Sequence, residues 1–360
     1  MKKLRVAFIG MAHIHLDNLS RDFYEHTDKV DIIGVADVPP YTQEEREIRI
    51  RLNMPKTFDL PIWDDYRELL SQNIDIAVVC TDIKAHADIV EEILGLNIHV
   101  VVDKPMAIDM DDAKRMYRAY HKSKAQLVIN WPVAWFPTFR KAKELADEGV
   151  VGKVMRVHYR SPANTGAYDI RKHDMGELAR LWWYRSDRGG GSICDYAGYG
   201  CLLATWIFGK TARRVSGFKK NFMHPFSDIE DYSTFTLDFG DGIGWLEGSW
   251  STMNNGEIPT GPVIYGTKGV IVADRYSNDV KVYHELTPHL PSVAPEATYT
   301  LGDVTEDVVQ NVIEHFTSGT PLNEMITPEF NMKVQAALDA GIRSCESGCI
   351  EDVAEPFYDL

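Results

Sequence analysis

One short segment near the start of the chain constrains the fold more than any other. Val6 to Ile9 is an apolar run with the length and composition of a buried parallel strand, and Gly10 ends it where a helix is expected to begin at once. Such a turn aims free backbone N–H groups at one point, where they can bind a pyrophosphate. We therefore expect the following residues to contact a dinucleotide: Gly10, Met11, Ala12, His13 and Ile14.

Apolar runs that alternate with amphipathic stretches continue to about residue 130. The predicted strands are residues 4–9, 30–36, 74–80, 98–102 and 126–129, and the clearest helices between them are 86–94 and 111–122. Alternation of this kind builds βαβ units with a parallel sheet. Residues 1–130 are thus predicted to be a Rossmann-type, doubly wound α/β domain that binds a dinucleotide.

The pattern changes after residue 131. One helix at 138–148 is followed by strands with no long helix between them, predicted at 154–159, 213–218, 232–239, 243–249, 263–265, 270–273 and 280–284. A second domain, residues 131–360, is therefore expected to be α+β, with a largely antiparallel open sheet for substrate binding and oligomerisation. Helices at 304–317 and 327–346 close the chain and can pack back on the first domain.

Composition excludes several classes of protein. A net charge of -15 repels nucleic acid and anionic membranes, and no apolar stretch has the length of a membrane span. The five cysteines form no CxxC pair, so neither a disulfide framework nor a zinc site is expected, and a reducing cytoplasm fits best. His13 and His15 are predicted to pack or to contact phosphate, because no cluster of partner ligands is evident, and no metal site is predicted.

The dinucleotide fingerprint itself is incomplete. Gly10, Ala12 and His15 occupy its three positions, and only the first is glycine. Asp37 supports the site, because it ends the second predicted strand, where a carboxylate can accept hydrogen bonds from the adenosine ribose; a solvated turn aspartate is the alternative. A carboxylate there repels a 2′-phosphate and residues 38–40 contain no arginine, so NAD is favoured over NADP.

Lys104 follows a predicted strand at its carboxyl end, the edge where open α/β sheets bind ligands. Beside a nicotinamide cation, desolvation and like charge are expected to disfavour its ammonium form and to suit it to general acid/base work. A surface lysine that ends a strand is the alternative.

These residues resemble the glucose-fructose oxidoreductase / inositol dehydrogenase (Gfo/Idh/MocA) family over nearly the whole chain. The family's Glu-Lys-Pro is Asp103-Lys104-Pro105 here, and Thr81 and His86 stand where the family has a loop and a histidine near the nicotinamide. The triple glycine that ends at Gly191 leads to Asp195. Further matching segments are residues 149–154, 183–185 and 264–269.

The resemblance implies an NAD-dependent oxidoreductase that acts on a secondary hydroxyl of a sugar, polyol or glycoside. Lys104 and Asp195 would be catalytic, and Thr81, His86 and Asp103 would join the cofactor site. Tyr199 stands where the family has a histidine that takes the substrate proton; it can relay a proton or merely pack. His173 is the first substitute for the missing histidine.

Two other functions stay open at this point. A retained NAD could oxidise a glycoside transiently in a redox-neutral reaction, or the chain could be a ligand-sensing regulator that has lost catalysis. The second domain's sheet is expected to carry helices on one face only, which predicts a homodimer or homotetramer. The particular small-molecule carbohydrate or polyol cannot be named from the sequence.

Overall fold

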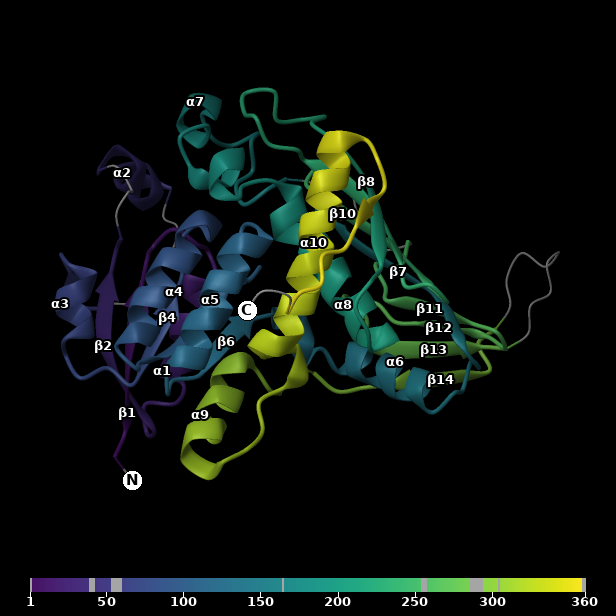
Figure 1. Ribbon diagram of the computed structural model, residues 1–360, viewed down its shortest axis with the longest axis horizontal. Coiled ribbons are helices and arrows are strands. Elements are labelled where there is room, and N and C mark those ends of the chain that lie inside the picture. Colours follow the sequence, from purple (N-terminus) through teal and green to yellow (C-terminus); the bar gives the residue numbers. More distant parts are fainter. Residues whose placement is uncertain are drawn as a thin grey trace.

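The computed structural model describes residues 2–38, 43–52, 60–163, 165–253, 258–284, 294–303 and 305–357. The chain forms two sheets that lie side by side, each with its own helices (Figure 1). The N-terminal sheet and its helices lie at one end of the molecule, and the large C-terminal sheet lies at the other. The long helix α10 (Pro328–Ser347) runs between them.

The first sheet has six parallel strands in the order β3-β2-β1-β4-β5-β6, which confirms the predicted doubly wound α/β architecture. Its strands are β1 (Leu4–Ile9), β2 (Val30–Ala36), β3 (Ile62–Trp63), β4 (Ile76–Val79), β5 (His99–Asp103) and β6 (Leu127–Asn130). The helices of this region are α1 (Leu16–Tyr24), α2 (Gln43–Arg51), α3 (Tyr66–Leu70), α4 (His86–Gly95) and α5 (Met110–Lys122). The two-residue strand β3 was not predicted, because it is too short to show a period.

The first helix begins later than the sequence predicts. Instead of starting directly after Gly10, at residue 11, α1 starts at Leu16, after a tight turn over residues 11–15. Two backbone N–H groups of this turn, those of Ala12 and His13, donate to the carbonyl of Cys80 at 3.1 and 3.0 Å. These bonds to the end of β4 replace the first intrahelical turn, which moves the helix start by five residues.

The second sheet has nine strands in the order β14-β13-β12-β11-β7-β10-β9-β8-β15. All neighbours are antiparallel except β7 and β10, which confirms a largely antiparallel sheet. The strands are β7 (Val154–Pro162), β8 (Arg214–Lys220), β9 (Tyr232–Asp238), β10 (Ile243–Ser249), β11 (Val263–Gly266), β12 (Val270–Val272), β13 (Asp279–Tyr283), β14 (Ala297–Thr300) and β15 (Glu351–Asp352). The edge strands β14 and β15 were not predicted.

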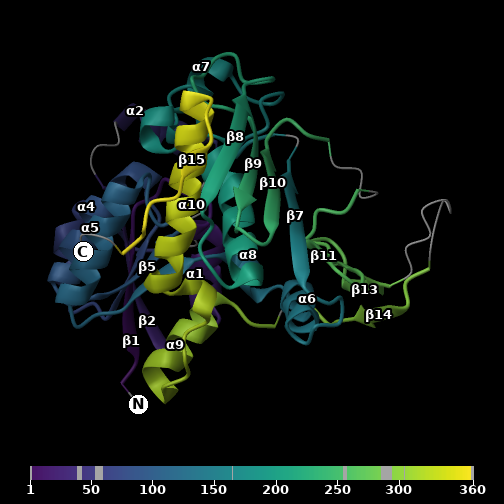
Figure 2. The same cartoon turned by 45° about the vertical axis from the view of Figure 1, so that its right-hand side comes forward.

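Helices cover one face of this sheet. α6 (Pro137–Asp147), α8 (Gly198–Phe208) and α10 pack on the same side, over buried residues such as Val157, Phe235 and Leu246 (Figure 2). The side chains that point the other way include Arg156, His158, Trp245 and Tyr265, which we call the outer face. In the described part of the chain, no helix packs on these four residues.

The C-terminal helices fold back on the first domain, as the sequence allowed. α10 contacts α5 and β6 as well as α8 and β8, and α9 (Val308–Ser318) contacts α1. Gln335 on α10 accepts a hydrogen bond from the Ala107 N–H at 3.3 Å, and Asn331 accepts one from the Trp131 indole at 2.6 Å. α10 was predicted within one residue at each end, whereas Val304, the expected start of α9, lies outside the described residues. None of the described helices combines the length and apolarity that crossing a bilayer requires.

Candidate functional site

Lys104 lies at the point where the two domains meet. It follows Asp103, the last residue of β5, and its side chain is 1% exposed. The ammonium donates to the Asp195 carboxylate at 2.6 Å and to the Asp195 backbone carbonyl at 2.9 Å. A residue of the first domain and one of the second thus form a single buried ion pair.

Asp195 is held in place by its own domain. It lies in a π-helical turn, Ile193–Ala197, that leads directly into α8. Its second carboxylate oxygen accepts a hydrogen bond from the Trp250 indole at 2.9 Å, and the turn begins where the Ile193 N–H donates to Glu230 at 2.8 Å. A wide turn of this kind is frequent at functional sites, because it re-aims a side chain.

The protonation of the pair differs from the expectation for a lone lysine. Burial lowers the pKa of Lys104, but the nearby Asp195 carboxylate more than compensates, so the pKa is raised above its usual value. Burial likewise raises the pKa of Asp195, and Lys104 reverses the shift, so that pKa is lowered. Without a cofactor the pair is therefore an ammonium and a carboxylate, and the weakening of the ammonium form beside a nicotinamide cation stays a prediction.

Tyr199 lies one helical turn beyond Asp195 and contacts the same lysine. Its ring centroid is 4.9 Å from the Lys104 ammonium, and the side chain is 3% exposed. Burial raises the pKa of Tyr199, while Lys104 and Arg275 act in the opposite direction. The ring therefore stabilises the ammonium by a cation–π contact. Its role as a proton relay remains a prediction.

Asp103 connects the turn after Gly10 to the end of β5. Its carboxylate lies 2.5 Å from His13 Nδ1 and 3.0 Å from His15 Nδ1, and it accepts a hydrogen bond from Asn130 at 3.2 Å. Burial raises the pKa of Asp103, but the two imidazoles outweigh it and the pKa is lowered well below its usual range. The expectation that His13 and His15 have no cluster of partner ligands is therefore wrong, because Asp103 brings a carboxylate to both, with the three ligand atoms within 4.8 Å of one another. The cluster has no local signature, since 88 residues separate His15 from Asp103.

Gly10 forms the cradle expected of a dinucleotide site. Its φ is +89°, and an added Cβ would lie 2.5 Å from the Thr81 side chain and 2.9 Å from the Thr81 nitrogen. Only glycine can bring the backbone this close to the β4 loop. The turn lies at the carboxyl edge of the parallel sheet, the edge at which a dinucleotide would bind with its phosphates over residues 10–14.

The backbone donors of this turn are partly used within the protein. Met11 N–H donates to the Asp37 carboxylate at 3.1 Å, and Gly10 N–H donates to the Ala36 carbonyl at 2.7 Å. Together with the bonds of Ala12 and His13 to Cys80, these contacts tie the turn to β2 and β4. The contacts of Gly10 to Ile14 with a cofactor remain predictions.

Asp37 has a partner that the local sequence does not show. Arg49 on α2 reaches its carboxylate at 2.7 Å and also donates to the Met11 carbonyl. The expectation that no arginine lies beside Asp37 is therefore wrong, because α2 packs near the end of β2 and brings Arg49 to its carboxylate. Arg49 is buried and bonded to protein acceptors, and so it is not presented outward as a phosphate ligand would be.

Two other predicted residues lie apart from the ion pair. His86 is buried at the start of α4, with Nδ1 3.3 Å from the Met106 carbonyl, and burial lowers its pKa. It therefore lies beneath the loop that follows Lys104. His173 contacts Tyr168, with ring centroids 6.1 Å apart, and no described contact joins it to Lys104 or Asp195. The catalytic role of His173 stays a prediction without geometric support.

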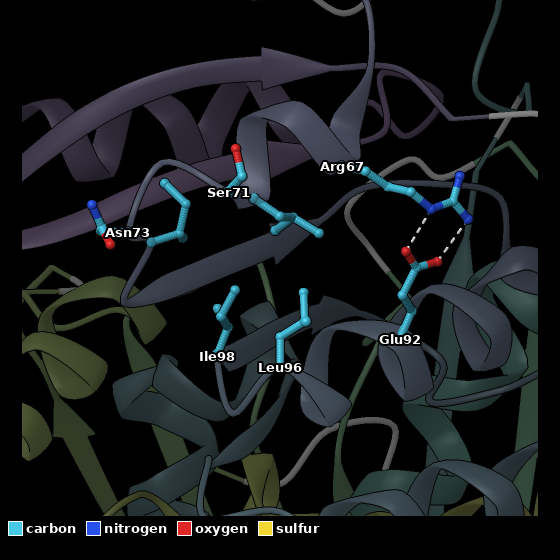
Figure 3. A pocket seen from close by; sticks show the side chains of 8 residues that line it. Arg67, Ser71, Asn73, Glu92, Leu96 and Ile98 are labelled. Carbon is cyan, nitrogen blue, oxygen red and sulfur yellow. Dashed lines mark hydrogen bonds and ion pairs between the residues drawn. The ribbon is translucent and has the colours of Figure 1, made fainter.

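The opposite end of the first sheet also has a hollow. A cavity of about 500 Å³ lies beside α3 and α4, with Leu96 and Ile98 on its floor and the Arg67–Glu92 ion pair at its rim (Figure 3). It lies at the amino ends of β4 and β5, away from Lys104. Since open α/β sheets bind ligands at their carboxyl ends, this cavity is not the candidate site.

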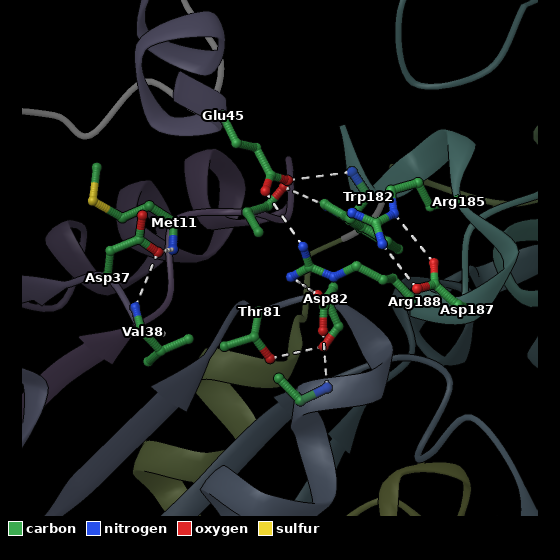
Figure 4. Close-up of polar contacts among 12 residues, drawn as sticks. Met11, Asp37, Val38, Glu45, Thr81, Asp82, Trp182, Arg185, Asp187 and Arg188 are labelled. Carbon is green, nitrogen blue, oxygen red and sulfur yellow. Dashed lines mark hydrogen bonds and ion pairs between the residues drawn. The ribbon is translucent and has the colours of Figure 1, made fainter. Parts of the chain in front are cut away.

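The second domain closes over the cofactor edge through a polar network (Figure 4). The Trp182 indole donates to the Ala12 carbonyl at 3.0 Å, and Arg188 pairs with Glu45 at 3.3 Å and with Asp82. A cavity of about 920 Å³ opens beside this network, between Lys84 and the segment around Arg185. Sequence reasoning missed Glu45, Arg188 and Trp250, because their roles depend on tertiary contacts; only the position of Arg188 beside the triple glycine was a signal.

Comparison with known protein families covers most of the chain. A family model described as "Oxidoreductase family, NAD-binding Rossmann fold" matches residues 4–131, and the GFO/IDH/MocA C-terminal domain matches residues 139–272. The myo-inositol 2-dehydrogenase of Thermotoga maritima is 26% identical over 165 residues, which are 44% of this chain and 46% of that protein. The chain spans about half the length of the first such relatives.

Solved structures show the same fold over the full length. The WlbA dehydrogenase from Bordetella pertussis, in complex with NADH and UDP-GlcNAcA, superposes with a TM-score of 0.73 at 19% identity, over 98% of this chain and 99% of that one. An aldose-aldose oxidoreductase from Caulobacter crescentus, complexed with glycerol, gives a TM-score of 0.73 at 18% identity, over 98% and 100%. At these identities the likeness establishes the fold alone.

Proposed function

Because the chain belongs to the Gfo/Idh/MocA family of NAD-binding oxidoreductases, we propose that it is a dehydrogenase that interconverts a secondary hydroxyl and a ketone on a sugar, polyol or glycoside. The observation that carries the proposal is the buried Lys104–Asp195 pair, 2.6 Å apart, at the carboxyl end of β5. A buried ion pair contributes little to stability, so its position at the ligand edge favours a chemical role.

The names of similar proteins agree with this substrate class. They include a myo-inositol 2-dehydrogenase and an aldose-aldose oxidoreductase, and one solved neighbour is a dehydrogenase in complex with NADH and UDP-GlcNAcA. These names describe those proteins; for this chain they support a carbohydrate or polyol substrate as a proposal.

We propose NAD rather than NADP as the cofactor. Gly10 would hold the pyrophosphate, with Thr81 and the end of β5 around the nicotinamide. Asp37 lies at the end of β2, where the adenosine ribose of a dinucleotide would lie, and its negative charge disfavours a 2′-phosphate. Arg49 is bound to Asp37 and to the Met11 carbonyl, which leaves it poorly placed to recognise such a phosphate.

The Lys104–Asp195 pair would accept the hydroxyl proton that the substrate loses on oxidation. When bound, NAD supplies the hydride acceptor. Lys104 Nζ would donate a hydrogen bond to the substrate oxygen and stabilise the alkoxide that develops as the alcohol is oxidised. As the substrate's hydroxyl proton moves to Lys104 Nζ, one of the ammonium protons would move from Nζ to Asp195, so that Nζ is an ammonium again; in the reverse direction both protons would move back. Tyr199 keeps the ammonium in place through its ring.

The test compares NADH formation by wild type and Lys104→Met with a panel of sugars and polyols. The methionine keeps the buried stem but removes the ammonium, so turnover should fall about 100-fold or more while NAD affinity changes only a few fold. Lys3→Met is the matched control, since Lys3 pairs with Asp31 at 3.4 Å at the amino end of β1, the end of the sheet opposite to Lys104, and should keep wild-type turnover.

Turnover that survives in Lys104→Met would contradict the assignment of Lys104. Stoichiometric release of NADH by wild type would exclude the redox-neutral alternative, in which the cofactor stays bound and is reoxidised in each cycle.

A further inference from the structure

Arg275 is a cation in the proposed substrate site without an acidic partner. It follows β12 by three residues and is only partly exposed. Its guanidinium carbon lies 6.0 Å from the Tyr199 ring centroid and 5.8 Å from that of Phe136. Among the described residues, no carboxylate forms an ion pair with it.

Asp274, the acidic residue next to Arg275 in the sequence, is hydrogen-bonded to Thr260 and to the backbone of Tyr276. One carboxylate oxygen of Asp274 accepts hydrogen bonds from the Thr260 N–H at 2.7 Å and the Thr260 hydroxyl at 3.1 Å. The other oxygen accepts the Tyr276 N–H at 2.7 Å. Asp274 therefore fixes the backbone of the turn that carries Arg275 and does not neutralise its side chain.

A second unsatisfied group lies close to this arginine. Tyr159 on β7 is fully buried, and the next residue of the strand bonds to the turn of Arg275: the Arg160 N–H donates to the carbonyl of Thr260, at 2.7 Å. Burial raises the pKa of Tyr159 to about 12, and the positive charge of Arg275 and a hydrogen bond with the Ser161 hydroxyl act against that rise. Ser161 is buried too, and one bond between these two hydroxyls uses only one of their two O–H donors. Buried donors without acceptors are costly unless a ligand satisfies them.

Two cations lie near the ring of Tyr199. Lys104 is neutralised by Asp195, whereas no carboxylate of the described residues pairs with Arg275. Among the described residues, one positive charge is therefore left over beside this ring. A planar, bidentate donor beside a phenol is suited to an anionic oxygen group.

We propose that Arg275 and Tyr159 form an anion subsite, and that the substrate is an acidic carbohydrate whose carboxylate or phosphate binds there while its reacting hydroxyl lies at Lys104. The substrate class rests on the proposed oxidoreductase function, but the anion subsite can be tested by binding alone. Arg275 is thus a specificity residue, and neutral sugars lack the group that it binds.

The test is a calorimetric titration with matched ligands: glucose against glucuronate, galactose against galacturonate, and glucose 6-phosphate. At least one acidic ligand should bind wild type ten-fold or more tightly than its neutral counterpart. Arg275→Gln should weaken that ligand by about 10- to 100-fold, with little effect on NAD affinity. Arg67→Gln is the matched control, because Arg67 pairs with Glu92 at the amino ends of the first sheet's strands, away from Lys104, and should leave binding unchanged.

The outcomes separate the two proposals. If wild type prefers the acidic ligand and Arg275→Gln loses this preference, the subsite is supported even where no NADH forms. The acidic ligand that is bound most tightly then shows whether the subsite takes a carboxylate or a phosphate. Equal affinity for acidic and neutral ligands, or a preference that survives in Arg275→Gln, overturns the subsite and leaves the Lys104 experiment unaffected.

Discussion

At the scale of single residues, the site is built from groups whose charges are set by burial and by one specific partner each. Lys104 and Asp195 keep each other charged in a place where either alone would be neutralised. Trp250 and Tyr199 add an indole hydrogen bond and a ring contact to this pair. Removing one partner leaves a buried charge, and so the two residues act as one unit.

The pKa of Glu230 is raised, unlike that of Asp195, and this shift predicts how the stability of the protein depends on pH. Its carboxylate supports the turn of Asp195 through Ile193 N–H, and burial raises its pKa from 4.5 to about 7, with Lys219 opposing and Asp231 adding to the rise. Because the folded state holds this proton more tightly than the unfolded state, Glu230 makes the protein less stable as pH rises from about 5 to about 8. At about 1.4 kcal/mol per pKa unit, the loss amounts to about 3 kcal/mol.

Glu230→Gln should remove this dependence. The amide oxygen keeps the acceptor for Ile193 but does not ionise, so the variant should gain about 2–3 kcal/mol of unfolding free energy relative to wild type between pH 5 and pH 8. Urea titrations at four pH values would measure the difference. A difference that is the same at pH 5 and at pH 8 would show that Glu230 does not titrate in this range.

At the scale of elements, the described helices that pack on the nine-stranded sheet lie on one of its faces, opposite the outer face (Figure 2). On this outer face, His158 lies 5.4 Å from the Trp245 ring and 4.8 Å from the Tyr265 ring, and Phe218 on β8 is 71% exposed. A broad, aromatic sheet face of this kind is typical of a surface that packs against another protein. We propose that it packs on the same face of a second copy.

Light scattering at micromolar concentration should give a mass of at least twice 40.8 kDa for wild type. Trp245→Asp places a charge in the centre of the outer face and should shift the protein toward the monomer, without a change in its circular dichroism. Leu96→Asp is the control, because Leu96 is exposed on the first domain and should leave the mass unchanged. A wild-type mass of 40.8 kDa would contradict the proposal.

Strands and helices with a strong period were predictable, and turns were not. The apolar runs of β1, β2, β4 and β5 and the capped helix α10 were placed within a few residues, because each is buried along its length or carries its own cap. The start of α1 was wrong, since the bonds of Ala12 and His13 to Cys80 are long-range and leave no local signature. The edge strands β14 and β15 were missed because they are short and half exposed.

At the scale of the whole molecule, the candidate site exists only where the two domains meet. The sequence identified Lys104, Asp195 and Tyr199 through resemblance, and the structure brings these three together. It did not identify Trp250 or Arg275, whose positions depend on how the second sheet packs around α8. Nor did it identify the Arg188–Glu45–Asp82 network that joins the domains over the fingerprint turn.

The contacts of the fingerprint turn also bear on the alternative that the chain is a ligand-sensing regulator. Because the N–H groups of Met11, Ala12 and His13 are bonded within the protein, a sensor that no longer binds a cofactor is the competing function. The dehydrogenase account requires the turn to accept a dinucleotide. Cofactor binding therefore separates the two functions before any substrate is known.

The most direct measurement is a calorimetric titration of NAD into protein stripped of bound nucleotide, with NADP as the comparison. The account predicts binding of NAD in the micromolar range, with NADP bound at least ten-fold more weakly because of the Asp37 carboxylate. Absence of binding by either nucleotide would contradict the account and would favour the ligand-sensing regulator instead.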